Sequence, residues 1–112
     1  MLHELIIYQK YYDLTLYAFP VIAKYPRDMR FTLGQQTLNC LLDMGRLIVR
    51  ANREHDRRKT QWEIDQKIEE VRLLTRLAKD LHLLPLKQYG QIAGRVAEIG
   101  RLLGGWIKSA AK

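Results

Sequence analysis

The segment from Phe31 to Lys59 constrains the fold most, because its apolar and small residues recur in alternating steps of three and four. This spacing places them on one face of an α-helix. A helix with one apolar face must bury that face against other elements, so the pattern predicts a helical core. The predicted buried row is Phe31, Gly34, Leu38, Leu41, Gly45 and Ile48.

Arginines in the same segment repeat with the same period on another helix face. Arginine forms paired, charge-assisted hydrogen bonds with phosphate oxygens, so the row can follow a nucleic-acid backbone if the helix persists that far. The alternative is a solvated face whose charge is partly neutralised by Asp43, Glu54 and Asp56. The predicted nucleic-acid-binding cations here are Arg46, Arg50, Arg53, Arg57, Arg58 and Lys59.

Two helices are expected before the cationic end of this segment. The first runs from about Leu2 to Lys24, and we expect it to bend at Pro20 and resume. The residues Tyr25-Pro26 then form a tight link, and Asp28 is expected to cap a second helix that ends near Asn52. The predicted buried side of the first helix is Leu5, Tyr8, Tyr12, Thr15, Phe19 and Ile22, with Leu16 beside them.

Two more helices follow. Thr60-Gln61-Trp62-Glu63 matches a capping box at the start of the third helix, and Pro85 is expected to stop that helix. The fourth helix runs from about Leu86 to Lys108. Their predicted buried rows are Ile64, Ile68, Val71, Leu74, Ala78 and Leu81, and then Tyr89, Ile92, Val96, Ile99, Leu103 and Trp106.

A row of small residues lies beside the buried row of the fourth helix, at Ala93, Ala97, Gly100 and Gly104. Each glycine inside a helix costs about 1 kcal/mol relative to alanine. We therefore expect another helix backbone to approach this row closely.

The chain has 112 residues, the length of a single domain (1–112). Four helices of similar length joined by short links predict an all-α, antiparallel up-down-up-down four-helix bundle.

The sequence offers no constellation for catalysis. No Glu-x-x-His pair is present, and His3, His55 and His82 are scattered over a terminus, a charged link and a helix end. Cys40 has no base near it in sequence, and no glycine-rich phosphate loop occurs. We therefore expect neither an enzyme nor a metal or other cofactor.

Cellular location follows from what the chain lacks. Cys40 is the only cysteine, so it cannot form an internal disulfide, and its apolar setting predicts a small buried side chain. No apolar run approaches the roughly 18 residues that a membrane span needs. We expect a cytoplasmic protein without a membrane segment.

The formal charge of +7 and the sequence pI near 9.8 favour an anionic partner, which is a nucleic acid, an acidic protein surface or an anionic membrane. A second set of cations, Arg72, Arg76 and Lys79, shares a face of the third helix, although Glu69 and Asp80 stand at pairing distance. The tyrosines at positions 8, 11, 12 and 17 could stack on bases, but their spacing favours packing in a core or interface.

Several stretches together resemble a known family. They are Tyr25-Pro-Arg-Asp-Met-Arg-Phe-Thr-Leu-Gly-Gln-Gln36 after a tyrosine-rich helix with Phe19-Pro20, the segment Val71-Arg-Leu-Leu-Thr-Arg-Leu-Ala-Lys-Asp-Leu81, and the ending Glu98-Ile-Gly-Arg-Leu-Leu-Gly-Gly-Trp-Ile-Lys108. The chain resembles the accessory variability determinant (Avd) proteins of diversity-generating retroelements. It is less similar to the related four-helix-bundle proteins of ribosomal RNA intervening sequences, since Arg30-Phe-Thr-Leu-Gly-Gln-Gln36 departs from their pattern.

The resemblance implies a non-enzymatic bundle that assembles as a basic, pentameric barrel. It implies association with the retroelement's reverse transcriptase and with template RNA or cDNA, in support of mutagenic reverse transcription and retrohoming. The alternative is a basic helix-bundle oligomer that binds an acidic protein partner without touching nucleic acid.

Overall fold

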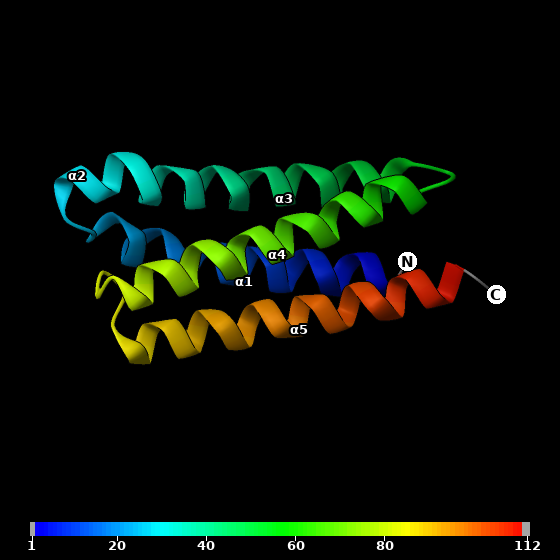
Figure 1. Ribbon diagram of the computed structural model, residues 1–112. Coiled ribbons are helices and arrows are strands. Elements are labelled where there is room, and N and C mark those ends of the chain that lie inside the picture. Colours follow the sequence, from blue (N-terminus) through cyan, green and yellow to red (C-terminus); the bar gives the residue numbers. More distant parts are fainter. Residues whose placement is uncertain (1, 111–112) are drawn as a thin grey trace.

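The computed structural model describes residues 2–110. These residues form four long helices, α1 (Leu2–Ala23), α3 (Gln35–Arg53), α4 (Arg58–Asp80) and α5 (Leu86–Ala110). A short helix α2 (Arg27–Met29) and a π-helical segment η1 (Arg30–Gly34) lead into α3. Consecutive long helices run in opposite directions (Figure 1), and no strand occurs within residues 2–110. The predicted all-α bundle is confirmed.

The helices enclose a core along an elongated body of 46 × 22 × 19 Å. The largest interfaces join α3 to α4 and α1 to α5. The contacts of α4 with α5 and of α1 with α3 are less extensive, so these two edges of the bundle are more open. Surface grooves lie along both of the open edges.

The predicted row of α5 is confirmed almost completely, because Ile92, Val96, Ile99, Leu103 and Trp106 are buried in the core. On α3 the buried side chains include Cys40, Leu41, Met44 and Ile48. The spacing predicts two of them, Leu41 and Ile48, and Cys40 is buried as its apolar setting predicts. Burial of these apolar side chains is the main force that holds the four helices together. Burial also raises the pKa of the Cys40 thiol to about 12, and its hydrogen bond to Glu70 adds to the rise.

The predicted face of α1 is wrong over most of its length, although Ile22 is buried as predicted. The buried residues are Ile7, Tyr11, Leu14, Ala18 and Ile22, whereas Leu5, Tyr8, Tyr12 and Leu16 are exposed. Two apolar rows with helical spacing run along this helix, so periodicity could not choose between them. The helix does continue through Pro20 to Ala23, as expected.

The start of the second predicted helix also differs from expectation. Asp28 is not a helix cap, since the chain enters α2 from Pro26 without a side-chain capping bond. The wide turn of η1 follows, and it shifts the register so that Phe31, predicted to be buried, is 68% exposed. From Gly34 onward the predicted α3 face is the observed one.

Both ends of α4 correct the sequence prediction. The helix begins at Arg58, and the Thr60 hydroxyl donates to the Glu54 carboxylate, so the predicted capping box does not form. The helix ends at Asp80, five residues before Pro85, because His82 adopts a left-handed conformation. Its N–H and that of Leu83 donate to carbonyls of the last helical turn, a Schellman motif.

That early end leaves Leu81 nearly half exposed, contrary to prediction, while Leu74 is only partly buried and Thr75 is buried beside it. The Thr75 hydroxyl is satisfied by the carbonyl of Val71, so burying it carries little cost.

Close packing requires a glycine at position 45 of α3, whereas the sequence predicts such packing at Gly100 and Gly104 of α5. A Cβ atom on Gly45 of α3 would collide with the ring of Tyr11, whose hydroxyl donates to the Leu41 carbonyl at 2.7 Å. On α5 the expected backbone contact is absent within the described chain. The position of a Cβ on Gly104 is open, and Gly100 faces only the Arg72 guanidinium.

Candidate nucleic-acid interface

The arginine row of α3 is shorter than its spacing suggests, because the helix ends at Arg53. Arg46 and Arg50 point outward from α3, and both are already paired. Arg46 contacts Asp43 at 2.8 Å, and Arg50 reaches across to Glu63 of α4 at 2.5 Å. The row therefore comprises three residues of one helix, of which two are neutralised locally.

Arg57 does not belong to this row. It lies in the α3–α4 loop and turns inward, where its guanidinium contacts Glu4 at 3.0 Å and lies 5.5 Å from the centre of the Trp106 ring. It also donates to the carbonyl of Glu54. With only 23% of its side chain exposed, Arg57 joins the loop to α1 and α5 and presents little charge to a ligand.

The remaining cations of the loop region are exposed. Arg58 makes a two-pronged contact with Asp56 at 2.9 and 3.0 Å, which lowers the pKa of that carboxyl to about 2. Within the described chain, Arg53 and Lys59 make no hydrogen bond or ion pair. Arg53 therefore carries uncompensated charge, whereas Lys59 lines a hollow that also contains Glu54, Asp56 and Glu63.

The surface between α3 and α4 is balanced in charge. The groove there is lined by three cations and three carboxylates, namely Arg46, Arg50, Lys67, Asp43, Glu63 and Glu70. The hollow at the loop end has an acidic excess, with Arg50 and Lys59 against Glu54, Asp56 and Glu63. On such a surface the carboxylates repel a polyanion about as strongly as the cations attract it.

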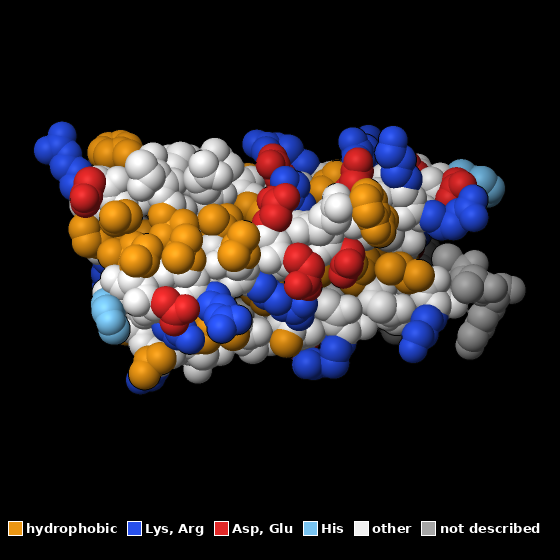
Figure 2. All heavy atoms as spheres, in the orientation of Figure 1, with side chains coloured by type: hydrophobic (Ala, Val, Ile, Leu, Met, Phe, Trp, Pro, Cys, Tyr) orange, Lys and Arg blue, Asp and Glu red, His pale blue; other side chains and the backbone are white. Residues whose placement is uncertain are grey.

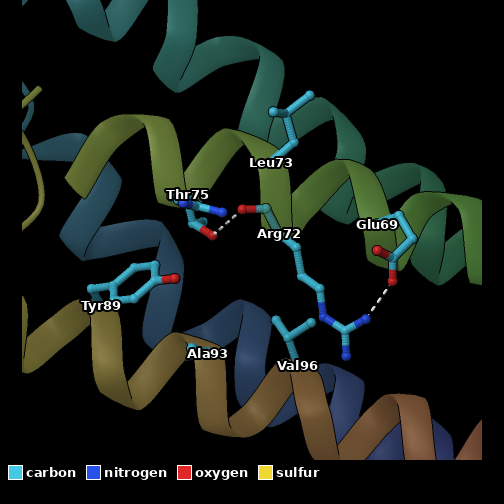
Figure 3. A pocket seen from close by; sticks show the side chains of 8 residues that line it. Glu69, Arg72, Leu73, Thr75, Tyr89, Ala93 and Val96 are labelled. Carbon is cyan, nitrogen blue, oxygen red and sulfur yellow. Dashed lines mark hydrogen bonds and ion pairs between the residues drawn. The ribbon is translucent and has the colours of Figure 1, made fainter. Parts of the chain in front are cut away.

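The groove between α4 and α5 is different, because cations outnumber acids in its lining (Figure 3). It has a volume of about 450 Å³ and is lined from α4 by Glu69, Arg72, Leu73, Thr75 and Arg76. Figure 3 shows Arg72 extended across the groove toward α5, with Glu69 bonded to it. Arg76 is 74% exposed, and its nearest acid, Asp80, is at 4.0 Å.

The wall of the groove formed by α5 consists mostly of small side chains, with one aromatic ring. Ala93 and Val96 line it, and Gly100 lies so close to the Arg72 guanidinium that a Cβ there would be 3.4 Å from it. Tyr89 stands at one end, with the Lys79 ammonium 4.8 Å from its ring centre. Small residues leave room for a bulky strand to reach the arginines, so the groove can accept a sugar–phosphate chain.

The sequence named Arg72 and Arg76 of this groove and the neighbouring Lys79, but it did not identify Tyr89, Ala93 and Val96 as the opposite wall. The small-residue row pointed to this surface, although we interpreted it as a helix contact. Among the described residues no cluster of histidine, cysteine and carboxylate side chains could hold a metal, and the side chain of His3 lies outside the described part. Of the grooves described above, the one between α4 and α5 has a cation excess in its lining, and this charge favours an anion.

These observations define a small, basic, antiparallel four-helix bundle with one cation-rich groove. A family model described as bAvd-like matches residues 5–110, and the chain belongs to this Avd family. Membership of this family indicates an accessory protein of a diversity-generating retroelement.

No curated protein matches the chain significantly. Among the described helices, none has the length and apolar character required to cross a lipid bilayer.

Proposed function

We propose that this chain is an accessory protein that binds the retroelement's reverse transcriptase and the template RNA or its cDNA. In this role it supports mutagenic reverse transcription and retrohoming in the cytoplasm, as a homopentameric basic barrel. Family membership supports the association with the polymerase. The net charge of +7 supports the association with nucleic acid.

The observation that carries nucleic-acid binding is the cation excess of the α4–α5 groove. Arg72 and Arg76 lie one helical turn apart on one wall, and Lys79 follows within the next turn. Exposed ion pairs such as those of Arg72 and Arg76 are worth about 0–1 kcal/mol, so a phosphate can replace the carboxylate at little cost. Such contacts hold a backbone without reading its bases, so we propose binding of low sequence specificity.

The other predicted cations contribute less in this proposal. Arg53 and Lys59 extend the basic surface around the α3–α4 loop, and Arg46, Arg50 and Arg58 add charge that their acidic neighbours offset. Arg57 stabilises the bundle and does not contact the ligand.

The test is fluorescence anisotropy of a labelled single-stranded RNA titrated with the wild type and with two triple variants. One variant carries Arg72→Gln, Arg76→Gln and Lys79→Gln; the matched control carries Arg46→Gln, Arg50→Gln and Arg53→Gln and loses the same charge. We expect the groove variant to bind at least about tenfold more weakly than the control, since it removes the phosphate contacts themselves.

Equal losses in the two variants would show that net charge alone attracts the RNA. Absence of RNA and DNA binding by the wild type would exclude this function. Retention of the reverse transcriptase after nuclease treatment, together with that absence, would then favour a bundle that binds only an acidic protein surface.

A further inference from the structure

Tyr89 gives the α4–α5 groove an aromatic surface in addition to its cations. The half-buried side chain lines the groove at one end, and its hydroxyl makes no hydrogen bond within the described chain. The Lys79 ammonium lies 4.8 Å from the ring centre, but Lys79 is not part of the groove lining. The side of the ring that borders the groove is therefore open to a ligand.

The floor of the groove between Tyr89 and Arg72 is apolar. Figure 3 shows the Tyr89 ring at one end and the Arg72 side chain crossing toward α5 at the other, with Ala93 and Val96 between them. Gly100, which faces the Arg72 guanidinium, follows Tyr89 by eleven residues, about 16 Å along an α-helix. Because phosphates of a stacked strand are about 3.4 Å apart along the helix axis, this length accommodates several nucleotides.

The cations of α4 follow the groove toward this ring. Since α4 and α5 run in opposite directions (Figure 1), Arg72 lies opposite Gly100, and Lys79 reaches Tyr89 two turns further on. In Figure 2, Lys and Arg side chains lie along the boundary between α4 and α5, with apolar side chains among them. Guanidinium groups bind phosphates, whereas an aromatic ring stacks on a planar base, so the groove offers one partner for each part of a nucleotide.

We propose that Tyr89 stacks on an unpaired base of a strand whose phosphates contact Arg72 and Arg76, so that the α4–α5 groove selects single-stranded over double-stranded nucleic acid. The inference rests on the nucleic-acid binding in the proposed function and specifies the class of nucleic acid. Bases in a duplex are covered on both faces by neighbouring pairs, whereas an unpaired base can stack on a side chain. Every base has such a face, so this selection agrees with low sequence specificity.

The tyrosines of the α1–α3 groove lack this combination. Tyr8 and Tyr12 stack on each other with ring centres 6.3 Å apart. The lining there contains one charged residue, Arg46, which contacts Asp43 at 2.8 Å, against two arginines in the α4–α5 groove. Tyr12 is 49% exposed, so its substitution by leucine is a matched control that removes an aromatic ring outside the cation-rich groove.

Fluorescence anisotropy with three labelled ligands of equal length tests the inference. The ligands are a single-stranded RNA, its blunt-ended duplex, and an abasic strand that has the same phosphates without bases. We expect the wild type to bind the single strand more tightly than the duplex, and at least about fivefold more tightly than the abasic strand. Tyr89→Leu should abolish both preferences, whereas Tyr89→Phe, which keeps the ring, and the control Tyr12→Leu should retain them.

Three results would overturn the inference. The first is a wild type that binds the abasic strand or the duplex as tightly as the single strand. The second is a Tyr89→Leu variant that keeps the preferences, and the third is their loss in Tyr12→Leu instead. If Tyr89→Leu fails to fold, Ala93→Met fills the floor beside the intact ring and should likewise lower single-strand affinity to that of the abasic strand.

The same titrations separate this inference from the proposed function. All of these variants retain every arginine and lysine, so the electrostatic attraction of phosphates is unchanged. Equal binding of the three ligands by the wild type would remove the inference alone and leave nucleic-acid binding in place. Binding of none of the three would remove nucleic-acid binding and the inference together.

Discussion

The cations of α3 and those of α4 have similar spacing in the sequence, but the fold gives them different surroundings. Both sets recur at helical spacing in the sequence. On α3 the spacing leads to Arg57, which the loop turns inward onto Glu4 and Trp106, while the cations that stay outside share their surface with as many acids. On α4 the helix continues past all three cations; Arg72 and Arg76 line the groove, and Lys79 lies over the Tyr89 ring at its end. Helical spacing predicts a common face only as far as the helix extends.

The comparison predicts that Arg57, although it fits the helical spacing of the row, stabilises the fold and does not bind the ligand. Arg57→Ala removes a largely buried ion pair and the contact with Trp106, so we expect the free energy of unfolding to fall by about 2 kcal/mol. Urea denaturation measures this loss. Arg58→Ala is the control, because its contact with Asp56 is exposed and the unfolding transition should barely change.

If Arg57→Ala unfolds like the wild type and weakens RNA binding instead, Arg57 belongs to the ligand surface after all. That result would restore the continuous row and break the comparison between the two helices.

A second prediction removes acids instead of cations. Glu69→Gln with Asp80→Asn releases the cations of the α4–α5 groove, and we expect RNA affinity to rise about fivefold, equivalent to roughly 1 kcal/mol. The matched control, Asp43→Asn with Glu63→Gln, releases Arg46 and Arg50 on the α3–α4 surface and removes the same charge. A gain in the control as large as in the groove variant would make the two regions equivalent.

The smallest expected effect concerns Cys40, which is enclosed between α3 and α4. Its folded-state pKa of about 12 lies above the ordinary thiol value of 9.0, so the folded protein keeps its proton when the unfolded chain begins to lose it. This contribution to stability is complete below pH 9 and is lost as the pH rises from 9 toward 12. At the start of that range, up to about pH 9.5, urea midpoints should fall slightly more for the wild type than for Cys40→Ala.

Native Cys40 should also resist a thiol reagent at pH 8 and react only after unfolding. Rapid labelling of the folded protein would show that the α3–α4 interface opens and is not the closed, charge-balanced surface described above.

Much of the fold follows from the sequence, while the faces and ends of the helices do not. The α5 row was predictable because Ile92, Val96 and Ile99 have no rival apolar row beside them. The α1 face was not, since Tyr8 and Tyr12 repeat as regularly as Ile7 and Tyr11, and the choice between the rows depends on Gly45 leaving room for Tyr11. The extra width of η1 has no signature in composition, so the exposure of Phe31 could not be foreseen.

The site shows the same limit. Arg72, Arg76 and Lys79 could be placed on one face from spacing alone, but their opposite wall comes from α5, about twenty residues later in the chain. The position of the Arg57 side chain depends on a loop and on contacts with Glu4 and Trp106, near the two ends of the chain. The periodicity of one segment does not describe such contacts.

The most direct test of nucleic-acid binding by the α4–α5 groove is the salt dependence of RNA affinity. A plot of log affinity against log salt concentration has a slope of about −0.7 for each phosphate neutralised on a single strand. We predict that the Arg72, Arg76 and Lys79 triple variant has a slope smaller in magnitude by about 2 than the wild type, while the Arg46, Arg50 and Arg53 variant changes little. An unchanged slope in the groove variant, with the loss appearing in the α3 variant, would contradict the account.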